Sequence, residues 1–193
     1  MGAMLGLHLL GLIVLLILLS GWQALTGIDG PQAFGEIPAH YLVPLAVLAA
    51  PLAEETVFRG WLSGRPRALW LLVCLIAGIA AIVLLTPVAS RILAIALTLL
   101  AAGIGWVVLR KRLAPAWFAR NFAAVFFASA AVFGMIHVFN YSEPGFVHVP
   151  MVLPQVWAGL TLGFLRMRVG LLAAMLVHGV SNGLALALAS LAG

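Results

Sequence analysis

The sequence has few charged residues and a single cysteine. Of its 193 residues only 8% are charged, whereas 65% are hydrophobic. Soluble domains carry about 25% charged residues, so this composition, with a mean hydropathy of +1.21, excludes a soluble globular domain. Cys74 has no partner for an internal disulfide, which excludes disulfide scaffolds and cysteine-rich metal sites. The first apolar run lacks a basic segment before it, so we interpret it as a retained helix and not as a signal peptide.

Long apolar runs occupy most of the chain, and a run of about 20 such residues is long enough to cross a bilayer as a helix. We predict an all-α fold, a polytopic transmembrane bundle of about seven spans with a polar site buried between helices. The expected spans are 4–24, 41–61, 68–88, 91–109, 120–140, 151–166 and 169–191. We divide the chain into 1–40, a first transmembrane helix with an outer loop, and 41–193, the core.

Basic residues stand at the ends of the apolar runs, which is typical of membrane orientation and not of nucleic-acid binding. One predicted side of the membrane holds Arg65, Arg67, Arg110, Lys111, Arg112, Arg120, Arg166 and Arg168. The other side holds Asp29, Glu36, Glu143 and Arg91. Because basic loops stay in the cytoplasm, we expect a cytoplasmic N-terminus and an outer C-terminus.

One apolar stretch, AEETVFRG at 53–60, contains two adjacent acids and an arginine. A charge at the centre of a bilayer costs about 3 kcal/mol. Glu55 and Arg59 are four residues apart on one helix face, so we predict an ion pair between them. Glu54 is rotated by about 100° from that face and has no local partner. Since ionisable groups inside membranes usually mark functional sites, a purely structural role for all three is the weaker interpretation.

Two histidines and an amide are placed in a similar way within later apolar runs. His137 lies in AAVFGMIHVF, and His178 is followed by Asn182 four residues later, on the same helix face. With few other buried polar groups available, these side chains and Glu54 are expected to satisfy one another. A carboxylate and an imidazole can take the proton of a water that attacks a carbonyl. A second imidazole and an amide can stabilise the resulting oxyanion, so the set is sufficient for peptide hydrolysis.

Three short motifs occur in order on separate predicted helices: EETVFR at 54–59, FGMIH at 133–137 and HGVSN at 178–182. They match the patterns EExxxR, FxxxH and HxxxN, and in this order they resemble the CPBP family of CAAX proteases and bacteriocin-processing enzymes, also called the ABI family. These proteins are intramembrane endopeptidases. The resemblance covers about residues 41–191.

The resemblance implies a role for each motif residue. Glu54 would be the catalytic base, His137 would help to activate water, and His178 with Asn182 would form the oxyanion site. The supporting residues would be Glu55, Arg59 and Phe133. The implied partners are a membrane-associated protein or peptide substrate and the lipid bilayer, without nucleic acid, and the small size with tight loops favours a bacterial inner membrane.

The metal requirement is open at this stage. The common zinc-protease motif HExxH is absent, but Glu54, His137 and His178 could supply a set of three zinc ligands. Asn182 beside His178 fits a pair of hydrogen-bond donors better than a ligand set. We therefore favour a metal-free, glutamic-type protease with no cofactor, and keep a zinc-dependent one as an alternative.

Two further readings use the same residues differently. The segment GVSNG at 179–183 also spells G-x-S-x-G, but a nucleophile elbow needs a strand-to-helix turn, so we interpret Ser181 as a helix hydroxyl and Gly179 and Gly183 as packing residues. The protein could also be a non-enzymatic transporter, scaffold or immunity-type protein, because buried ionisable groups can carry protons. The sequence shows no internal repeat or half-helix pair of the kind found in many transporters.

The predicted depths of the site residues disagree with one another. At 1.5 Å per residue, Glu54 and His178 lie about 12–14 Å from the cytoplasmic side, whereas His137 lies about 25 Å along its span. If the three meet, the fifth span must begin later than residue 120. We then expect 115–126, which includes Trp117 and Arg120, to lie partly in the membrane interface.

Overall fold

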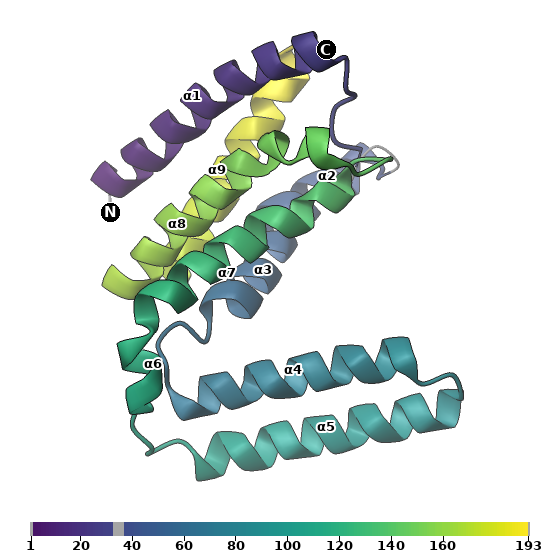
Figure 1. The fold of residues 1–193 in the computed structure, drawn as a ribbon, viewed down its shortest axis with the longest axis vertical. Helices are drawn as coiled ribbons and strands as arrows, with labels where there is room; N and C mark the ends of the chain where they lie inside the picture. Colours follow the sequence, from purple (N-terminus) through teal and green to yellow (C-terminus); the bar gives the residue numbers. More distant parts are fainter. Residues whose placement is uncertain (1, 33–36, 193) are drawn as a thin grey trace. The chain divides into compact units, whose positions relative to one another are not determined.

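The computed structural model describes residues 2–32 and 37–192, and every regular element within these ranges is a helix (Figure 1). The N-terminal elements are α1 (Gly2–Thr26), α2 (Ala39–Pro44), the π-helix η1 (Leu45–Ala49) and α3 (Ala50–Arg59). The middle elements are α4 (Pro66–Leu84), α5 (Val88–Val108), α6 (Ala116–Arg120) and α7 (Phe122–Ile136). The C-terminal elements are the short 3₁₀ turns η2 (His137–Asn140), η3 (Phe146–His148) and η4 (Pro150–Val152), then α8 (Leu153–Arg168) and α9 (Leu171–Ala192).

Seven helical segments are long and apolar enough to cross a membrane, which confirms the predicted all-α transmembrane bundle. They are Gly2–Thr26, His40–Arg59, Pro66–Leu84, Val88–Val108, Phe122–Asn140, Phe146–Arg168 and Leu171–Leu191. Glu36, which we assigned to the acidic side, lies outside the described residues.

The span boundaries differ from the predicted ones where proline and glycine act. The second span ends at Arg59, two residues earlier than predicted, and the turn before the next span contains Gly64 with a φ of +66°. The third span begins at Pro66 and ends at Leu84. Pro66 occupies the first turn of α4, and Pro87 is the N-cap of α5, so the two prolines set where these helices start.

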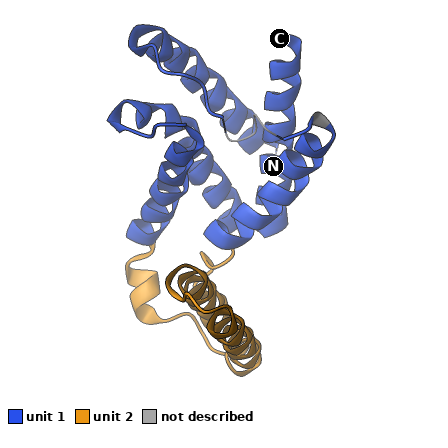
Figure 2. Ribbon diagram, turned by 90° about the vertical axis from the view of Figure 1, so that its right-hand side faces the viewer, with its two compact units in different colours: residues 1–59, 123–193 blue, residues 60–122 orange. Residues whose placement is uncertain are grey.

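The chain forms two compact units, residues 1–59 with 123–193 and residues 60–122 (Figure 2). The second unit is a hairpin of α4 and α5 with the short helix α6. Trp70 packs against Gly105, and its Nε1 donates a hydrogen bond of 2.8 Å to the carbonyl of Ala101. A Cβ on Gly64 would lie 2.5 Å from the ring of Phe118, so glycine permits the close approach of α6 to the turn before α4.

The segment 115–126 contains a break between two helices. Asn121 separates α6 from α7, and its side chain donates a hydrogen bond of 2.7 Å to the carbonyl of Trp117 at the end of α6. The fifth span accordingly begins at Phe122, later than predicted. The interfacial position of α6 stays a prediction.

In the first unit, α1 packs on α8, α8 packs on α9, and η1 with α3 packs on α9. Gly159 of α8 is tightly packed, since a Cβ there would lie 2.8 Å from the Cα of Ala130. Gly163 is similar, because its Cβ would lie 2.8 Å from the ring of Phe126. Gly159 and Gly163, which are four residues apart on α8, therefore both permit close packing of α8 against α7.

Candidate functional site

The carboxylates of α3 occupy two different environments. Arg59 Nη1 lies 2.9 Å from Glu55 Oε1, and the two side chains are 1% and 0% exposed, so the predicted ion pair is present and fully buried. Glu54 lies on another face of α3, and its side chain is 29% exposed. The helix therefore buries a neutralised pair and leaves the second carboxylate accessible.

The helix before these carboxylates contains a π-bulge that exposes backbone groups to α9. In η1 the amide of Ala50 donates to the carbonyl of Leu45, five residues back. The next bond of this kind would join residue 51 to the carbonyl of Ala46, but Pro51 has no N–H. Asn182 Nδ2 donates to that carbonyl instead, at 2.8 Å. The bulge thus creates an orphan acceptor, which a residue of α9 satisfies.

A glycine of α9 allows this contact to form. A Cβ at Gly179 would lie 2.5 Å from the carbonyl oxygen of Val47, so a larger residue would push α9 away from η1. At Gly183 a Cβ would lie 3.6 Å from Val47 Cγ2, which is ordinary contact. The close approach of the two helices brings His178 to α3.

His178 lies between the two carboxylates of α3. Its Nδ1 is 2.9 Å from Glu55 Oε1 and its Nε2 is 3.8 Å from Glu54 Oε2. Because an ionised carboxylate only accepts hydrogen bonds, Nδ1 is the donor to Glu55, and Nε2 is the nitrogen that faces Glu54. The buried Glu55 thus fixes the orientation of His178, a role that the sequence analysis did not assign to it.

The ring of Phe133 joins the remaining parts of the cluster. The guanidinium of Arg59 lies over this ring, 3.9 Å from its centroid. The ring centroid of His137 is 4.9 Å from that of Phe133, and the centroid of His178 is 6.1 Å from it. Phe133 is 1% exposed, so its contacts with a cation and two imidazoles are shielded from the surroundings.

His137 is near the cluster but does not touch the carboxylates. It follows α7 in the turn η2, and its Nδ1 donates a hydrogen bond of 2.7 Å to the carbonyl of Phe133. Within the described ranges, no hydrogen bond or ion pair joins His137 to Glu54 or His178. Since Nδ1 holds the proton, Nε2 is the nitrogen that can accept one.

Asn182 and Ser181 follow His178 on α9. One N–H of the Asn182 amide is used by the Ala46 carbonyl, which leaves the second N–H of the same group for another acceptor. Ser181 is buried and donates a hydrogen bond of 2.8 Å to the carbonyl of Val177, as expected of a helix hydroxyl.

Two side chains that the sequence analysis did not place at the site hold the C-terminal end of α3. Arg166 Nε donates to the carbonyl of Arg59 at 3.1 Å, and Ser129 Oγ donates to the carbonyl of Phe58 at 3.0 Å. The last carbonyls of a helix have no partner within it, so the predicted end of the helix indicates which carbonyls need a donor. The sequence does not indicate which distant side chains donate to them.

The set considered for zinc is not assembled as a ligand cluster. In the part of the chain that the structure describes, no three side chains of His, Cys, Asp or Glu are grouped so that they could hold a metal ion. Two buried polar atoms of this cluster, Glu55 Oε2 and Arg59 Nη2, have no hydrogen-bond partner among the described residues. Both belong to the ion pair on α3, so one acceptor and one donor group of that pair have unused hydrogen-bonding capacity.

Comparison with known proteins places these residues in one family. The family model for type II CAAX prenyl endopeptidase Rce1-like proteins matches residues 37–184, which include all three motifs. No curated protein and no solved structure matches the chain. The match covers most of the chain and agrees with the resemblance to CAAX proteases found from the motifs. This integral membrane protein therefore belongs to the type II CAAX prenyl endopeptidase Rce1-like family.

Proposed function

We propose that this CAAX-type intramembrane protease hydrolyses its membrane-associated peptide substrate with Glu54 as the general base. The observation that carries the proposal is the arrangement of α3 and α9, in which His178 is fixed by Glu55 at 2.9 Å and faces Glu54 at 3.8 Å. Glu54 is the partly exposed member of the carboxylate pair. It is therefore the one that a water molecule and a substrate can reach.

The attacking water would be activated by Glu54 together with His137. The Glu54 carboxylate takes a proton from the water as its oxygen bonds to the scissile carbonyl carbon. The proton then passes from Glu54 to the leaving amine, which breaks the C–N bond and restores the carboxylate. His137 supports this step if its Nε2, which carries no proton, accepts the second hydrogen of the water.

The oxyanion would be stabilised by His178 and Asn182. The Nδ1–H of His178 donates to Glu55, so the ring donates to the oxyanion from Nε2 when both of its nitrogens carry a proton. The Nε2–H of His178 and the second N–H of Asn182 are the two donors for the developing charge. The contact between Glu55 and Nδ1 holds the ring in this orientation.

The orientation of the bundle follows from the basic residues. We propose a cytoplasmic N-terminus and an outer C-terminus in a bacterial inner membrane, because the ends of the spans with most Lys and Arg are retained in the cytoplasm. To test this orientation, a cysteine is introduced near each terminus of a variant that lacks Cys74. The reaction of each cysteine with a membrane-impermeant reagent is then measured.

The mechanism is tested with three variants of the purified, reconstituted protein. We expect Glu54→Gln, which keeps the shape of the side chain, to reduce kcat by about 10²–10⁴-fold because it removes the base. We expect His178→Ala to lower kcat as well, since an oxyanion donor is lost. Ser181→Ala is the matched control on α9 and should cleave at the wild-type rate, because its hydroxyl bonds only the helix.

The substrates are peptides with a C-terminal CAAX sequence, with and without a prenylated cysteine, and membrane-anchored peptides without that sequence. Each variant is assayed with and without a strong chelator, and its thermal unfolding is measured. Cleavage lost in Glu54→Gln and His178→Ala but retained with chelator supports the metal-free mechanism. Cleavage that chelator abolishes and zinc restores assigns Glu54, His137 and His178 to a zinc site. If both variants fold and cleave the substrate at the wild-type rate, the proposal is contradicted.

A further inference from the structure

Basic side chains without acidic counterparts gather at one end of the second compact unit. Residues 60–122 contain no Asp or Glu. At the end where α4 begins and α5 finishes, six basic residues form what we call the basic cluster, Arg65, Arg67, Arg110, Lys111, Arg112 and Arg120. The opposite end of the hairpin holds Arg91 alone.

Contacts within this unit bring the members of the basic cluster to one end. The guanidinium of Arg67, in the first turn of α4, lies 4.5 Å from the ring centroid of Trp106, near the end of α5. The short helix α6, which carries Arg120, is tied to the turn before α4 because the ring of Phe118 packs on Gly64 and on Trp61. The basic cluster is therefore a feature of the folded unit and not only of the sequence.

Within the described ranges, the members of the basic cluster have no acidic partner. The ion pairs of Arg59 and His178 with Glu54 and Glu55 include none of the six residues. Five of the six side chains are exposed, and Arg67 is partly covered by Trp106. These cations are therefore accessible to negative charge from outside the protein.

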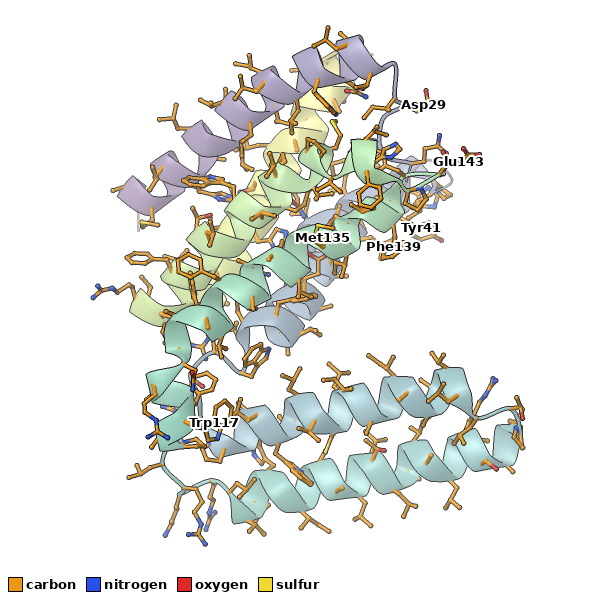
Figure 3. All side chains as sticks on the ribbon, in the orientation of Figure 1. Asp29, Tyr41, Trp117, Met135, Phe139 and Glu143 are labelled. Atoms are coloured by element: carbon orange, nitrogen blue, oxygen red, sulfur yellow. The ribbon has the colours of Figure 1, made fainter. Side chains whose placement is uncertain are left out.

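The location of the basic cluster identifies the occupant. It lies where the span Pro66–Leu84 begins and the span Val88–Val108 ends, which is the level of the lipid headgroups. Exposed apolar side chains alternate with the charges: Leu113 is 90% exposed and Trp117, on α6, is 51% exposed (Figure 3). Apolar and aromatic groups of this kind insert at the boundary between headgroups and acyl chains.

We propose that the basic cluster binds the headgroups of anionic phospholipids, and that this docks the α4–α5 hairpin and α6 on one leaflet. Five guanidinium groups and one ammonium group favour phosphate, which guanidinium can hold through two parallel hydrogen bonds. Juxtamembrane clusters of four to eight basic residues are typical binding sites for anionic lipids. This binding is separate from the chemistry at Glu54 and goes beyond membrane orientation, which requires no bound lipid.

The test compares two matched variants of the full chain. In the triple variant Arg110→Gln, Lys111→Gln and Arg112→Gln, three members of the basic cluster lose their charge. In the control Arg91→Gln, the single arginine at the other end of the same hairpin loses its charge. Binding of phosphatidylglycerol and of phosphatidylcholine is measured by native mass spectrometry and by titration of detergent-solubilised protein with fluorescent lipid.

We expect the triple variant to bind phosphatidylglycerol about 10–100-fold more weakly than the wild type, because each basic residue near an anionic surface contributes to binding. Arg91→Gln should bind like the wild type. The double variant Arg110→Lys and Arg112→Lys keeps the charge and should retain most of the binding of phosphatidylglycerol. Equal melting temperatures of all variants exclude misfolding as the cause of a loss.

Four results would overturn the proposal. The first is that the triple variant binds phosphatidylglycerol as tightly as the wild type does, and the second is that the wild type binds phosphatidylcholine equally well. Inorganic phosphate at millimolar concentration could displace the lipid completely, which would make this a site for free phosphate. A raised KM for an acidic peptide in neutral-lipid nanodiscs, with unchanged lipid binding, would assign the basic cluster to substrate recruitment.

Discussion

At the residue scale, the site depends on the different environments of two neighbouring acids, Glu54 and Glu55. Glu55 accepts hydrogen bonds from Arg59 and His178 with the same oxygen, Oε1. It is completely buried, whereas Glu54 is partly exposed. A buried charge is tolerated only with partners, so the contacts of Glu55 serve structure and orientation, and our proposal assigns the chemistry to Glu54.

The first residue-scale prediction concerns the loss of the Glu55 charge. Glu55→Gln keeps the side-chain shape but leaves Arg59 buried without a counter-ion, so we expect the free energy of unfolding to fall by about 3–5 kcal/mol. The kcat of the fraction that still folds should also fall, because His178 loses the partner that holds its ring. Thermal unfolding and cleavage of a single substrate measure the two effects.

The matched control is Glu143→Gln, which removes an exposed acid from the loop between η2 and η3 (Figure 3). Its unfolding free energy should stay within about 0.5 kcal/mol of the wild type. If Glu55→Gln is as stable as this control and has an unchanged kcat, then Glu55 does not hold His178.

At the element scale, the bulge in η1 decides how α9 meets α3. The π-turn and Pro51 together leave the Ala46 carbonyl without a helical donor, and Asn182 supplies one. Sequence periodicity predicts an uninterrupted span here, because a single π-turn changes the pattern of apolar residues very little. The bulge is therefore a feature that the sequence analysis missed, although Pro44 and Pro51 were visible signals of an irregular helix.

The element-scale prediction uses the glycines of α9. Gly179→Ala would place a Cβ 2.5 Å from the carbonyl oxygen of Val47, a backbone atom that cannot rotate away. We expect α9 to shift, with a loss of about 1–3 kcal/mol in stability and a lower kcat, since His178 moves with the helix. Thermal unfolding and cleavage of a single substrate measure both.

Gly183→Ala is the control on the same helix, because its Cβ would lie at an ordinary 3.6 Å from Val47 Cγ2. It should match the wild type in both measurements. Equal behaviour of the two variants would show that the close contact of α9 with η1 is not needed for the site.

At the scale of the whole molecule, the first helix is part of the site's support although the family match begins after it. The match starts at residue 37, whereas α1 ends at Thr26. His8 of α1 is 1% exposed and lies 2.7 Å from Thr161 Oγ1 of α8, and Trp157 Nε1 donates to the His8 carbonyl at 3.0 Å. Helix α8 in turn packs against α9, so α1 braces the helix pair that carries His178.

The whole-molecule prediction concerns the bond between α1 and α8. Thr161→Val is nearly isosteric but leaves His8 buried without its partner, so we expect a loss of about 0.6–2 kcal/mol, the range for hydrogen bonds between membrane helices. Thr98→Val is the control. The Thr98 hydroxyl bonds only a carbonyl of its own helix, at 2.7 Å. Thermal unfolding in one detergent compares the two, and equal melting temperatures would contradict a bracing role for His8.

Features that depend on local spacing could be predicted from the order of the residues alone. Apolar runs fix the seven spans, because a helix of fixed rise needs a fixed number of residues to cross a bilayer. The ion pair of Glu55 with Arg59 could be predicted because the two residues are four apart and therefore lie on the same face of a helix. The motifs also identified the family, since their order along the chain is a property of the sequence.

The contacts between residues far apart in the sequence could be seen only in the tertiary structure. The bond between His178 and Glu55 joins residues 123 apart, and the bond between Asn182 and Ala46 joins residues 136 apart. The structure places the ring of His137 against that of Phe133, whereas the expected meeting of His137 with Glu54 stays a prediction. Helical periodicity sets the face from which a side chain projects, whereas the partner on the facing helix depends on the bulges, glycines and caps that set how closely the helices pack.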